Sequence, residues 1–196
     1  METKINLGTV PVVERMGCWR GGNKVATYSL SVKEVAVDLE TATAESLFAE
    51  AADRDKTELA LKTADLTCID RLMGLYLIGP ESGYPVKIGI SDTVKARLSA
   101  LQTGSWEKVK LHALLWLFGY DAYGVEQAVL KEAKRIGCHE RGEWLSLTPV
   151  SAMDMVIDAA RAEGVRVFTS AMAVENQGRA LMHLDRASRM CGNGIF

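Results

Sequence analysis

The sequence predicts a mixed α/β (α+β) fold, in which a small mixed β-sheet is flanked by helices. Two observations carry this prediction. Two short apolar runs, residues 75–79 and 86–90, enclose a turn-forming Glu-Ser-Gly-Tyr-Pro segment, which is typical of a β-hairpin. A helical pattern, an apolar strand-like run and a second helical pattern follow in turn. Helices and strands therefore alternate along the chain.

The composition is that of a globular chain. Its 196 residues are enough to bury a sizeable core, and 48% hydrophobic with 24% charged residues argue against intrinsic disorder. The formal net charge is −2, so binding to nucleic acid would need a local basic face. The four cysteines form no CxxC pair, and their spacing gives no support for a zinc site.

Neither a signal peptide nor a membrane span is expected. The start of the chain lacks a basic region followed by an apolar one. The longest apolar run, residues 113–118, is far shorter than the roughly 20 residues that cross a bilayer. We therefore expect a soluble, cytoplasmic protein without a membrane partner.

The first of three stretches, residues 1–72, mixes strand-like and helical patterns. Residues 21–23 suit a turn between two strands, and residues 42–64 predict a helix with Thr41 or Thr43 as its N-cap. The strand-like runs cover residues 10–14, 24–32 and 34–39. The role of this stretch is open: it could add strands, recognise a substrate or bind a protein partner.

The second stretch, residues 73–148, has the most regular pattern. After the hairpin, Ser91 or Asp92 can cap a helix that runs to Leu101, and Gly104 ends it. The elements expected next are a buried strand at 109–118, a helix capped by Asp121 and closed by Gly137, and a short strand at 144–147.

The third stretch, residues 149–196, is expected to be a helical extension packed on the core. Thr148 as N-cap and Pro149 at the first helical position predict a helix start. A brief strand at 165–168 and a helix from about 172 to 190 should follow.

Two short motifs lie in the hairpin. Gly74-Leu75-Tyr76 and Lys87-Ile88-Gly89 are separated by ten residues. Further along stand Leu101-Gln-Thr-Gly and Gly142-Glu-Trp-Leu. Together, residues 74–147 resemble the GIY-YIG nuclease superfamily: the first pair is similar to its two half-motifs, and the later phrases resemble a phage-associated branch.

The resemblance implies a GIY-YIG-like core that works as a metal-dependent endonuclease on DNA phosphodiester bonds. In that family a tyrosine helps to deprotonate water, an arginine steadies the phosphate and a glutamate holds one Mg²⁺ or Mn²⁺. The matching residues here are Tyr76, Arg97 and Glu126, with Lys87 assisting. An arginine fork suits phosphate geometry, and a carboxylate is a hard ligand for Mg²⁺.

Two positions depart from the family pattern. Lys87 stands where the second half-motif normally has a tyrosine, although the phage-associated branch tolerates lysine there. Leu130 stands where that branch tends to have a histidine. A lysine with an ordinary pKa of about 10.4 is a poor base unless it is desolvated. Tyr84, in the hairpin loop, could replace the missing phenol.

Further side chains are candidates for substrate contact: Tyr84, Lys131, Arg135, His139 and Glu143. Lys131 and Arg135 share a helix face that could follow a phosphate backbone or simply be solvated. Glu143 could be a second carboxylate of the site or a charge at a strand edge. The tryptophans at 106, 116 and 144 are expected in the core rather than as platforms for bases.

A second hypothesis is a catalytically weak or inactive module, derived from a nuclease, that binds nucleic acid or a protein partner. Lys87, Leu130 and the acidic isoelectric point of about 6.0 favour it. A related alternative is a mobile-element regulator or inhibitor in which residues 1–72 make the functional contact.

Overall fold

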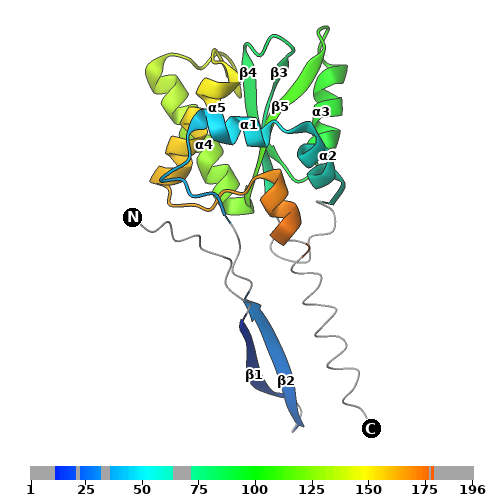
Figure 1. Cartoon of the computed structure of the whole chain (residues 1–196). Helices are drawn as coiled ribbons and strands as arrows, with labels where there is room; N and C mark the ends of the chain where they lie inside the picture. Colours follow the sequence, from blue (N-terminus) through cyan, green and yellow to red (C-terminus); the bar gives the residue numbers. More distant parts are fainter. Residues whose placement is uncertain (1–11, 21–22, 32–35, 64–71, 177, 179–196) are drawn as a thin grey trace. The chain divides into compact units, whose positions relative to one another are not determined.

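The computed structural model describes residues 12–20, 23–31, 36–63, 72–176 and 178 (Figure 1). The chain divides into two compact units, residues 1–35 and 36–196. In the first unit, β1 (Val12–Arg20) pairs antiparallel with β2 (Asn23–Ser31). Two of the predicted N-terminal strands are thus confirmed in their described parts.

The third predicted N-terminal strand, at residues 34–39, is wrong for its described part. Residues 36–38 have no regular structure, and a turn begins at Leu39. The turn forms because Asp38 accepts hydrogen bonds through its own backbone and side chain: its carbonyl receives the N–H of Ala42 at 3.0 Å, and its carboxylate receives the N–H of Glu40 at 3.1 Å. Aspartate commonly folds the chain back in this way.

The second unit contains a four-stranded sheet in the order β5-β3-β4-β6. Its strands are β3 (Leu72–Pro80), β4 (Val86–Ser91), β5 (Val109–Phe118) and β6 (Trp144–Leu145). The mixed α/β class is confirmed, but all three strand pairs are antiparallel, so the expected mixed sheet is wrong. The hairpin sets β4 against β3, and the next crossover returns the chain to the far side of β3.

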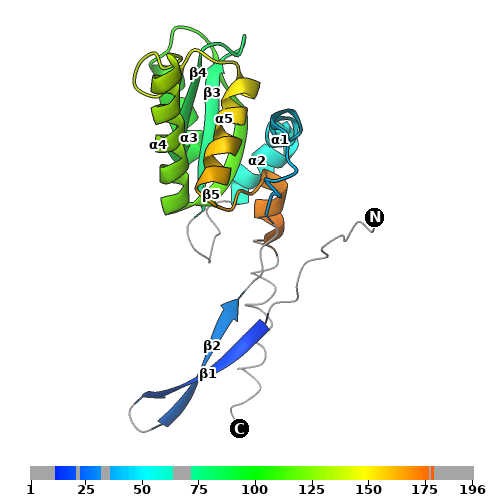
Figure 2. The same ribbon diagram turned by 90° about the vertical axis from the view of Figure 1, so that its left-hand side faces the viewer.

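Helices cover both faces of this sheet. They are α1 (Ala44–Ala51), α2 (Arg54–Thr63), α3 (Val94–Thr103), α4 (Gly119–Ile136) and α5 (Pro149–Ala162), and residues 170–176 are also helical. α1, α4 and α5 pack on one face, and α2, α3 and the 170–176 helix pack on the other (Figures 1 and 2). The α1 and α2 segment, predicted to belong with the N-terminal region, is thus part of the second unit.

Two of the predicted helix N-caps, Thr43 and Thr148, are confirmed. The N–H of Ser46 donates to the Thr43 hydroxyl at 3.2 Å, as expected for α1. The predicted single helix at 42–64 is nevertheless two, because the Asp53 carboxylate accepts the N–H groups of Asp55 and Lys56 and starts a new helix. Thr148 caps α5 as predicted, with the N–H of Ser151 at 3.2 Å.

Two predicted caps are wrong by a few residues. Thr93 rather than Ser91 or Asp92 precedes α3, while the Ser91 hydroxyl accepts the N–H of Thr93 at 3.0 Å. α4 begins at Gly119, before the predicted cap Asp121. Gly137 closes α4 as expected, with a left-handed φ of 79° that glycine adopts without strain.

The strand and the helix predicted in the C-terminal stretch are confirmed in part. The strand expected at 165–168 is reduced to a single bridge between Phe168 and Trp116, with hydrogen bonds of 2.8 and 2.9 Å. The helix expected at 172–190 begins at residue 170, and residues 179–190 lie outside the described part. Within the described residues, no helix has the length and apolar character needed to cross a membrane.

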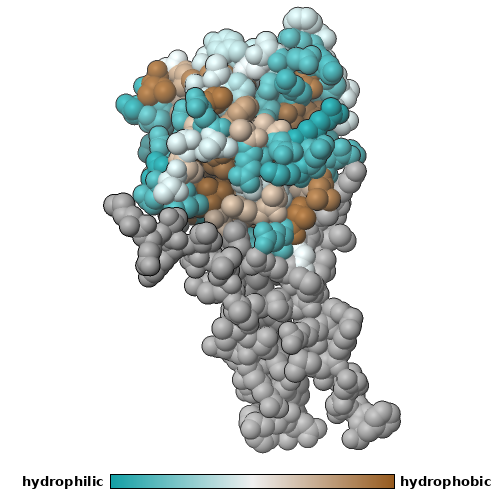
Figure 3. All heavy atoms as spheres, in the orientation of Figure 1, coloured by the Kyte–Doolittle hydropathy of each residue, from teal (hydrophilic) through white to brown (hydrophobic). Residues whose placement is uncertain are grey.

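The visible surface of the described second unit is largely hydrophilic, with small apolar patches scattered over it (Figure 3). Most of the large apolar side chains are buried on the two faces of the sheet. The sheet residues alternate between these faces: Leu75 and Leu77 point towards α4 and α5, while Tyr76 and Ile78 point towards α3. This alternation decides which side chains can reach a common site.

Tyr76 and Gly89 stand opposite each other in the β3–β4 pair. A Cβ atom added at Gly89 would lie 2.3 Å from the Tyr76 hydroxyl oxygen and 2.5 Å from its Cζ. The Tyr76 ring is buried, with 1% of its surface exposed, so it has no free space to move into. Glycine at 89 is therefore required for the tyrosine ring to lie across β4.

We predict that Gly89→Ala destabilises the second unit, because an extra methyl group overpacks this contact by about 1–3 kcal/mol. The midpoint of thermal unfolding should fall by roughly 5 °C. Gly124→Ala is the matched control, since a Cβ at Gly124 meets nothing within 4 Å and alanine favours its helix. Equal midpoints for Gly89→Ala and the wild type would contradict the close contact.

Candidate functional site

Three of the predicted site residues meet on the face of the sheet that carries α3. Tyr76 lies on β3 on this face. Lys87 lies opposite Ile78 in the β3–β4 register and so points to the same side. From α3, the Arg97 Nε donates a hydrogen bond to the Tyr76 hydroxyl at 3.3 Å. The tyrosine thus joins the sheet to the arginine.

Two glutamates lie along the outer edge of β4. β6 pairs only with Val86 and Lys87, so the rest of this edge is available to other groups. The N–H of Ile88 donates to the backbone carbonyl of Glu143 at 3.0 Å, and the backbone of Ile90 lies close enough to the Glu126 carboxyl to lower its pKa. Because alternate N–H groups of a strand point to the same edge, the two glutamates follow one another along β4.

Lys87 connects the two groups of residues. Its ammonium forms an ion pair with the Glu143 carboxylate, and its positive charge also acts on Glu126. Only 7% of the Lys87 surface is exposed. A lysine this buried is retained because its charge is compensated by nearby carboxylates. Glu143 therefore lies beside Lys87 and supplies the carboxylate that compensates its charge.

The pKa of the Glu126 carboxyl is raised. Burial is the largest cause, and the negative charge of Glu143 adds to it. The amide of Gln127, the charge of Lys87 and the N–H of Ile90 act in the opposite direction without cancelling the effect. Glu126 is therefore a carboxylate that the fold holds in an unfavourable place for a negative charge.

The pKa of Tyr76 is also raised, chiefly by burial and further by Glu143 and Glu126, while Arg97 opposes the shift. The phenol consequently keeps its proton at neutral pH. The hydrogen bond to Tyr76 raises the pKa of Arg97, so the guanidinium stays charged. Two contacts, Arg97–Tyr76 and Lys87–Glu143, and the electrostatic effects that reach Glu126 link five residues, which are termed the site cluster: Tyr76, Lys87, Arg97, Glu126 and Glu143.

Four other predicted substrate-contact residues make no described contact with the site cluster: Tyr84, Lys131, Arg135 and His139. Tyr84 is 52% exposed in the hairpin loop and does not replace the missing phenol. Arg135 pairs with Glu132 on the exposed side of α4. The His139 Nε2 donates to the carbonyl of Gly142 at 2.8 Å and so closes its own turn. Lys131 is exposed on α4.

Leu130 belongs to the hydrophobic core between α4 and the sheet, where 8% of its surface is exposed. A histidine here would be surrounded by apolar side chains. The departure from the family pattern at this position therefore fills the core and leaves the site cluster unchanged.

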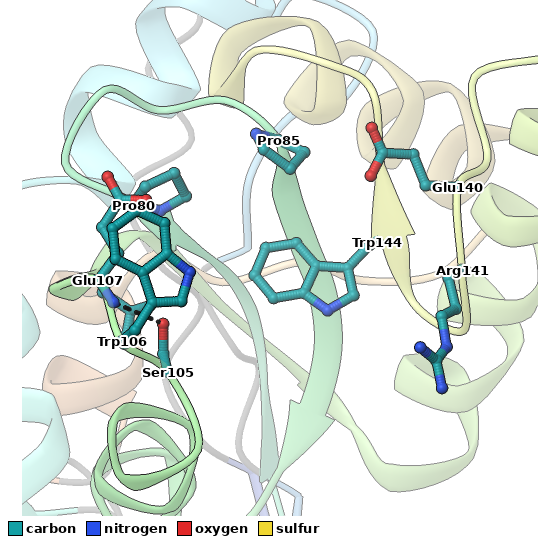
Figure 4. Close-up of a pocket in the computed structure, with 9 residues that line it drawn as sticks. Pro80, Pro85, Ser105, Trp106, Glu107, Glu140, Arg141 and Trp144 are labelled. Carbon is teal, nitrogen blue, oxygen red and sulfur yellow. Dashed lines mark hydrogen bonds between the residues drawn. The ribbon is translucent and has the colours of Figure 1, made fainter.

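A pocket of about 330 Å³ that the sequence analysis did not identify lies beside the site cluster. Its walls include Pro80, Pro85, Trp106, Glu140, Arg141 and Trp144 (Figure 4). Trp106, expected in the core, is 96% exposed, whereas Trp116 is buried as expected. The polar neighbours of Trp106, a serine and the pair Glu-Lys, are the sequence signal that could have indicated a loop position.

The site cluster contains two carboxylates, Glu126 and Glu143, which are the type of side chain that binds Mg²⁺ or Mn²⁺ in proteins. Among the described residues, no group of three or more His, Cys, Asp or Glu side chains could enclose a metal ion. Mg²⁺ does not need such an enclosure, because it keeps several waters and uses one or two carboxylates. Glu126, with Glu143 beside it, would supply these carboxylates. After burial, the negative charge of Glu143 is the next cause of the raised pKa of Glu126, and a divalent cation would relieve that repulsion.

Comparison with known proteins adds no relative. A scan against protein-family models finds no matching family, and searches of curated proteins and of solved structures find no match. Any proposal of function therefore depends on the geometry of the chain's own residues.

We predict that Glu126→Gln stabilises the protein at neutral pH. Because the pKa of Glu126 is raised in the folded state, folding favours its protonated form. That contribution is complete below the ordinary pKa of glutamate and is lost as the pH rises through the folded pKa. The neutral glutamine avoids this loss and keeps the shape, so the midpoint of unfolding should rise by about 2–4 °C.

The control for this prediction is Glu81→Gln in the exposed hairpin loop, which should leave the midpoint unchanged. Thermal unfolding followed by circular dichroism over a range of pH values measures both. The advantage of Glu126→Gln should vanish in acid, where both side chains are neutral. A Glu126→Gln variant that is less stable than the wild type at pH 7 would show that the folded protein does not disfavour the ionised form of Glu126.

Proposed function

We propose that this protein is an endonuclease that hydrolyses phosphodiester bonds with the help of a divalent metal ion, DNA being the expected substrate. One observation supports the proposal above others. Five chemically suited side chains, which come from β3, β4, α3, α4 and the turn before β6, converge in the site cluster. Such an arrangement also supports membership of the GIY-YIG superfamily.

The charges of the site cluster suit a phosphodiester and a metal ion bound together. Lys87 and Arg97 carry two positive charges, and Glu126 and Glu143 carry two negative charges when ionised. The cluster alone is therefore close to neutral. A phosphodiester brings one negative charge and Mg²⁺ brings two positive charges, so the full assembly has a small positive excess. Such an excess stabilises the charge that builds up on phosphate oxygens.

Arg97 is the residue that we assign to the phosphate. Its Nε is engaged by the Tyr76 hydroxyl, which leaves the two terminal nitrogens of the guanidinium for phosphate oxygens. The Arg97 side chain is exposed on α3 and can be reached by a substrate. A guanidinium held by one hydrogen bond loses less freedom when it binds, because its fork is already oriented.

Glu126 is assigned as the metal-holding carboxylate, with Glu143 beside it. When bound, Mg²⁺ would supply positive charge at the leaving oxygen. The protein's own side chains would orient the attacking water and accept its proton. The Tyr76 phenol keeps its proton and can orient the attacking water, and the Glu143 carboxylate, held by Lys87, can accept the proton that this water releases.

A second candidate function is a binding module that has lost turnover. The observation that favours it is the Lys87–Glu143 ion pair, which satisfies both charges and makes Lys87 unsuitable as a base. This candidate predicts that nucleic acid binds to the site without being cut, with or without a metal ion. A cleavage assay separates the two candidates directly.

We predict metal-dependent cleavage that depends on Arg97 and Glu126. Supercoiled, linear and branched DNA, and RNA, are incubated with the protein and Mg²⁺ or Mn²⁺. Arg97→Ala and Glu126→Ala should each lower the rate by about 100-fold or more, because each removes a charge that acts in the transition state. The matched control is Arg135→Ala, which removes an exposed arginine outside the site cluster and should keep wild-type activity.

Absence of cleavage for every substrate at enzyme excess, in the presence of either metal, would exclude the nuclease proposal. Cleavage that survives Glu126→Ala would instead show a wrong site assignment or a contaminating nuclease. Folding of each variant is checked by its thermal midpoint, so that lost activity is not mistaken for lost structure.

A further inference from the structure

The pocket beside the site cluster opens on the same face of the sheet. Trp144 on β6 lies opposite Lys87 in the β4–β6 register, so both side chains point to one side of the sheet. Lys87 is two residues from Gly89, over which Tyr76 lies. Two residues of a strand span about 7 Å. The pocket therefore begins within a single nucleotide's reach of the proposed reaction site.

We propose that this pocket binds unpaired bases of a single-stranded nucleic acid next to the phosphate that the site cluster engages. The proposal rests on the proposed function, whose substrate class it defines. Its main support is Trp106, a tryptophan with 96% of its surface exposed at the pocket wall. Indole rings that face solvent are suitable platforms for bases, since every base offers a flat face to stack.

Trp106 is held in place by its own loop. Gln102 bridges this loop in two ways: its side-chain amide donates to the carbonyl of Glu107 at 3.1 Å, and its side-chain oxygen accepts the N–H of Val109 at 2.9 Å. The N–H of Glu107 also donates to the Ser105 hydroxyl at 3.3 Å. The exposed ring is therefore carried by an ordered backbone, which reduces the entropy that binding must overcome.

The rest of the pocket wall is also ordered. Buried His112 donates from Nε2 to the carbonyl of Pro80 at 2.8 Å, and the N–H of Gly83 donates to the same carbonyl at 2.9 Å. On the other side, the N–H of Trp144 donates to the carbonyl of Arg141 at 3.0 Å. Figure 4 shows the Trp144 ring between Trp106 and Arg141, with Pro85 above it.

Arg141 supplies the positive charge that a nucleic-acid backbone needs. Its side chain is exposed and lies at the pocket wall next to Trp144. The same turn carries Glu143 of the site cluster two residues later. A strand of nucleic acid could therefore stack a base on the tryptophans, place a phosphate near Arg141 and continue towards Arg97. An intact duplex cannot do this, because its bases are already stacked and paired.

The test measures binding without catalysis. Fluorescence anisotropy follows labelled oligothymidylate and oligouridylate of about twelve nucleotides, and a blunt DNA duplex of the same length, in EDTA. Trp106→Ala should weaken binding of the single strands about tenfold and leave the duplex unaffected, while Trp106→Phe should retain most of the affinity. The matched control is Tyr120→Ala, which removes a tyrosine that is also 96% exposed but lies on α4.

A second measurement concerns Arg141. If its guanidinium contacts a phosphate, Arg141→Gln should reduce the dependence of single-strand affinity on salt by the equivalent of about one phosphate contact. The two oligonucleotides show whether the pocket accepts DNA, RNA or both, and preference for either supports the proposal.

Two results would overturn the inference. The first is an affinity for single strands that is unchanged in Trp106→Ala. The second is absence of binding to both oligonucleotides, which would indicate that the pocket binds a peptide instead. Failure of the nuclease proposal gives a different result. In that case no substrate is cleaved with Mg²⁺ or Mn²⁺, yet the loss of single-strand binding in Trp106→Ala persists, and the inference stands.

Discussion

The close approach of Tyr76 to the backbone of Gly89 is the constraint on which the rest of the site depends. Because residue 89 has no side chain, the Tyr76 ring can lie across β4 and present its hydroxyl to α3. That hydroxyl receives the Arg97 Nε. A larger residue at 89 would displace the ring and, with it, the partner that orients the arginine. The packing of two strands thus determines the position of a charge on a neighbouring helix.

The shortness of β6 is equally important, because it leaves most of the β4 edge without a strand partner. Pairing ends after Val86 and Lys87. Beyond them, the Ile88 N–H donates to the Glu143 carbonyl, and the Glu126 carboxyl lies near the backbone of Ile90. A longer β6 would pair with the backbone of Ile90 as well and exclude Glu126 from this edge. Incomplete pairing at this edge therefore brings two carboxylates together, at the expense of a raised pKa for Glu126. Such local strain is common where a fold supports chemistry rather than stability.

Local signals explain which parts of the fold could be predicted from sequence. The hairpin, the Thr148–Pro149 helix start and the Gly137 helix end depend on neighbouring residues and were predicted. The break at Asp53, the antiparallel sheet and the exposure of Trp106 depend on which partners are available in space, so local sequence patterns do not indicate them. For the site, the resemblance placed Tyr76, Lys87, Arg97 and Glu126, which the structure brings together. Glu143 was left open, because its position depends on the His139–Gly142 contact within the turn.

The site cluster and the tryptophan pocket share structural supports, which argues for treating them as one surface. The turn at 139–143 carries both Arg141, which lines the pocket, and Glu143, which belongs to the site cluster. Lys87 on β4 forms an ion pair with Glu143 and stands opposite Trp144 in the β4–β6 pair. Gln102 holds the Trp106 loop from the end of the helix whose first turns carry Arg97. A change that moves α3 along the sheet would therefore alter phosphate contact and base contact together. Because the same backbone elements support the site cluster and the pocket, only a change at the end of a side chain would remove phosphate contact or base contact without affecting the other.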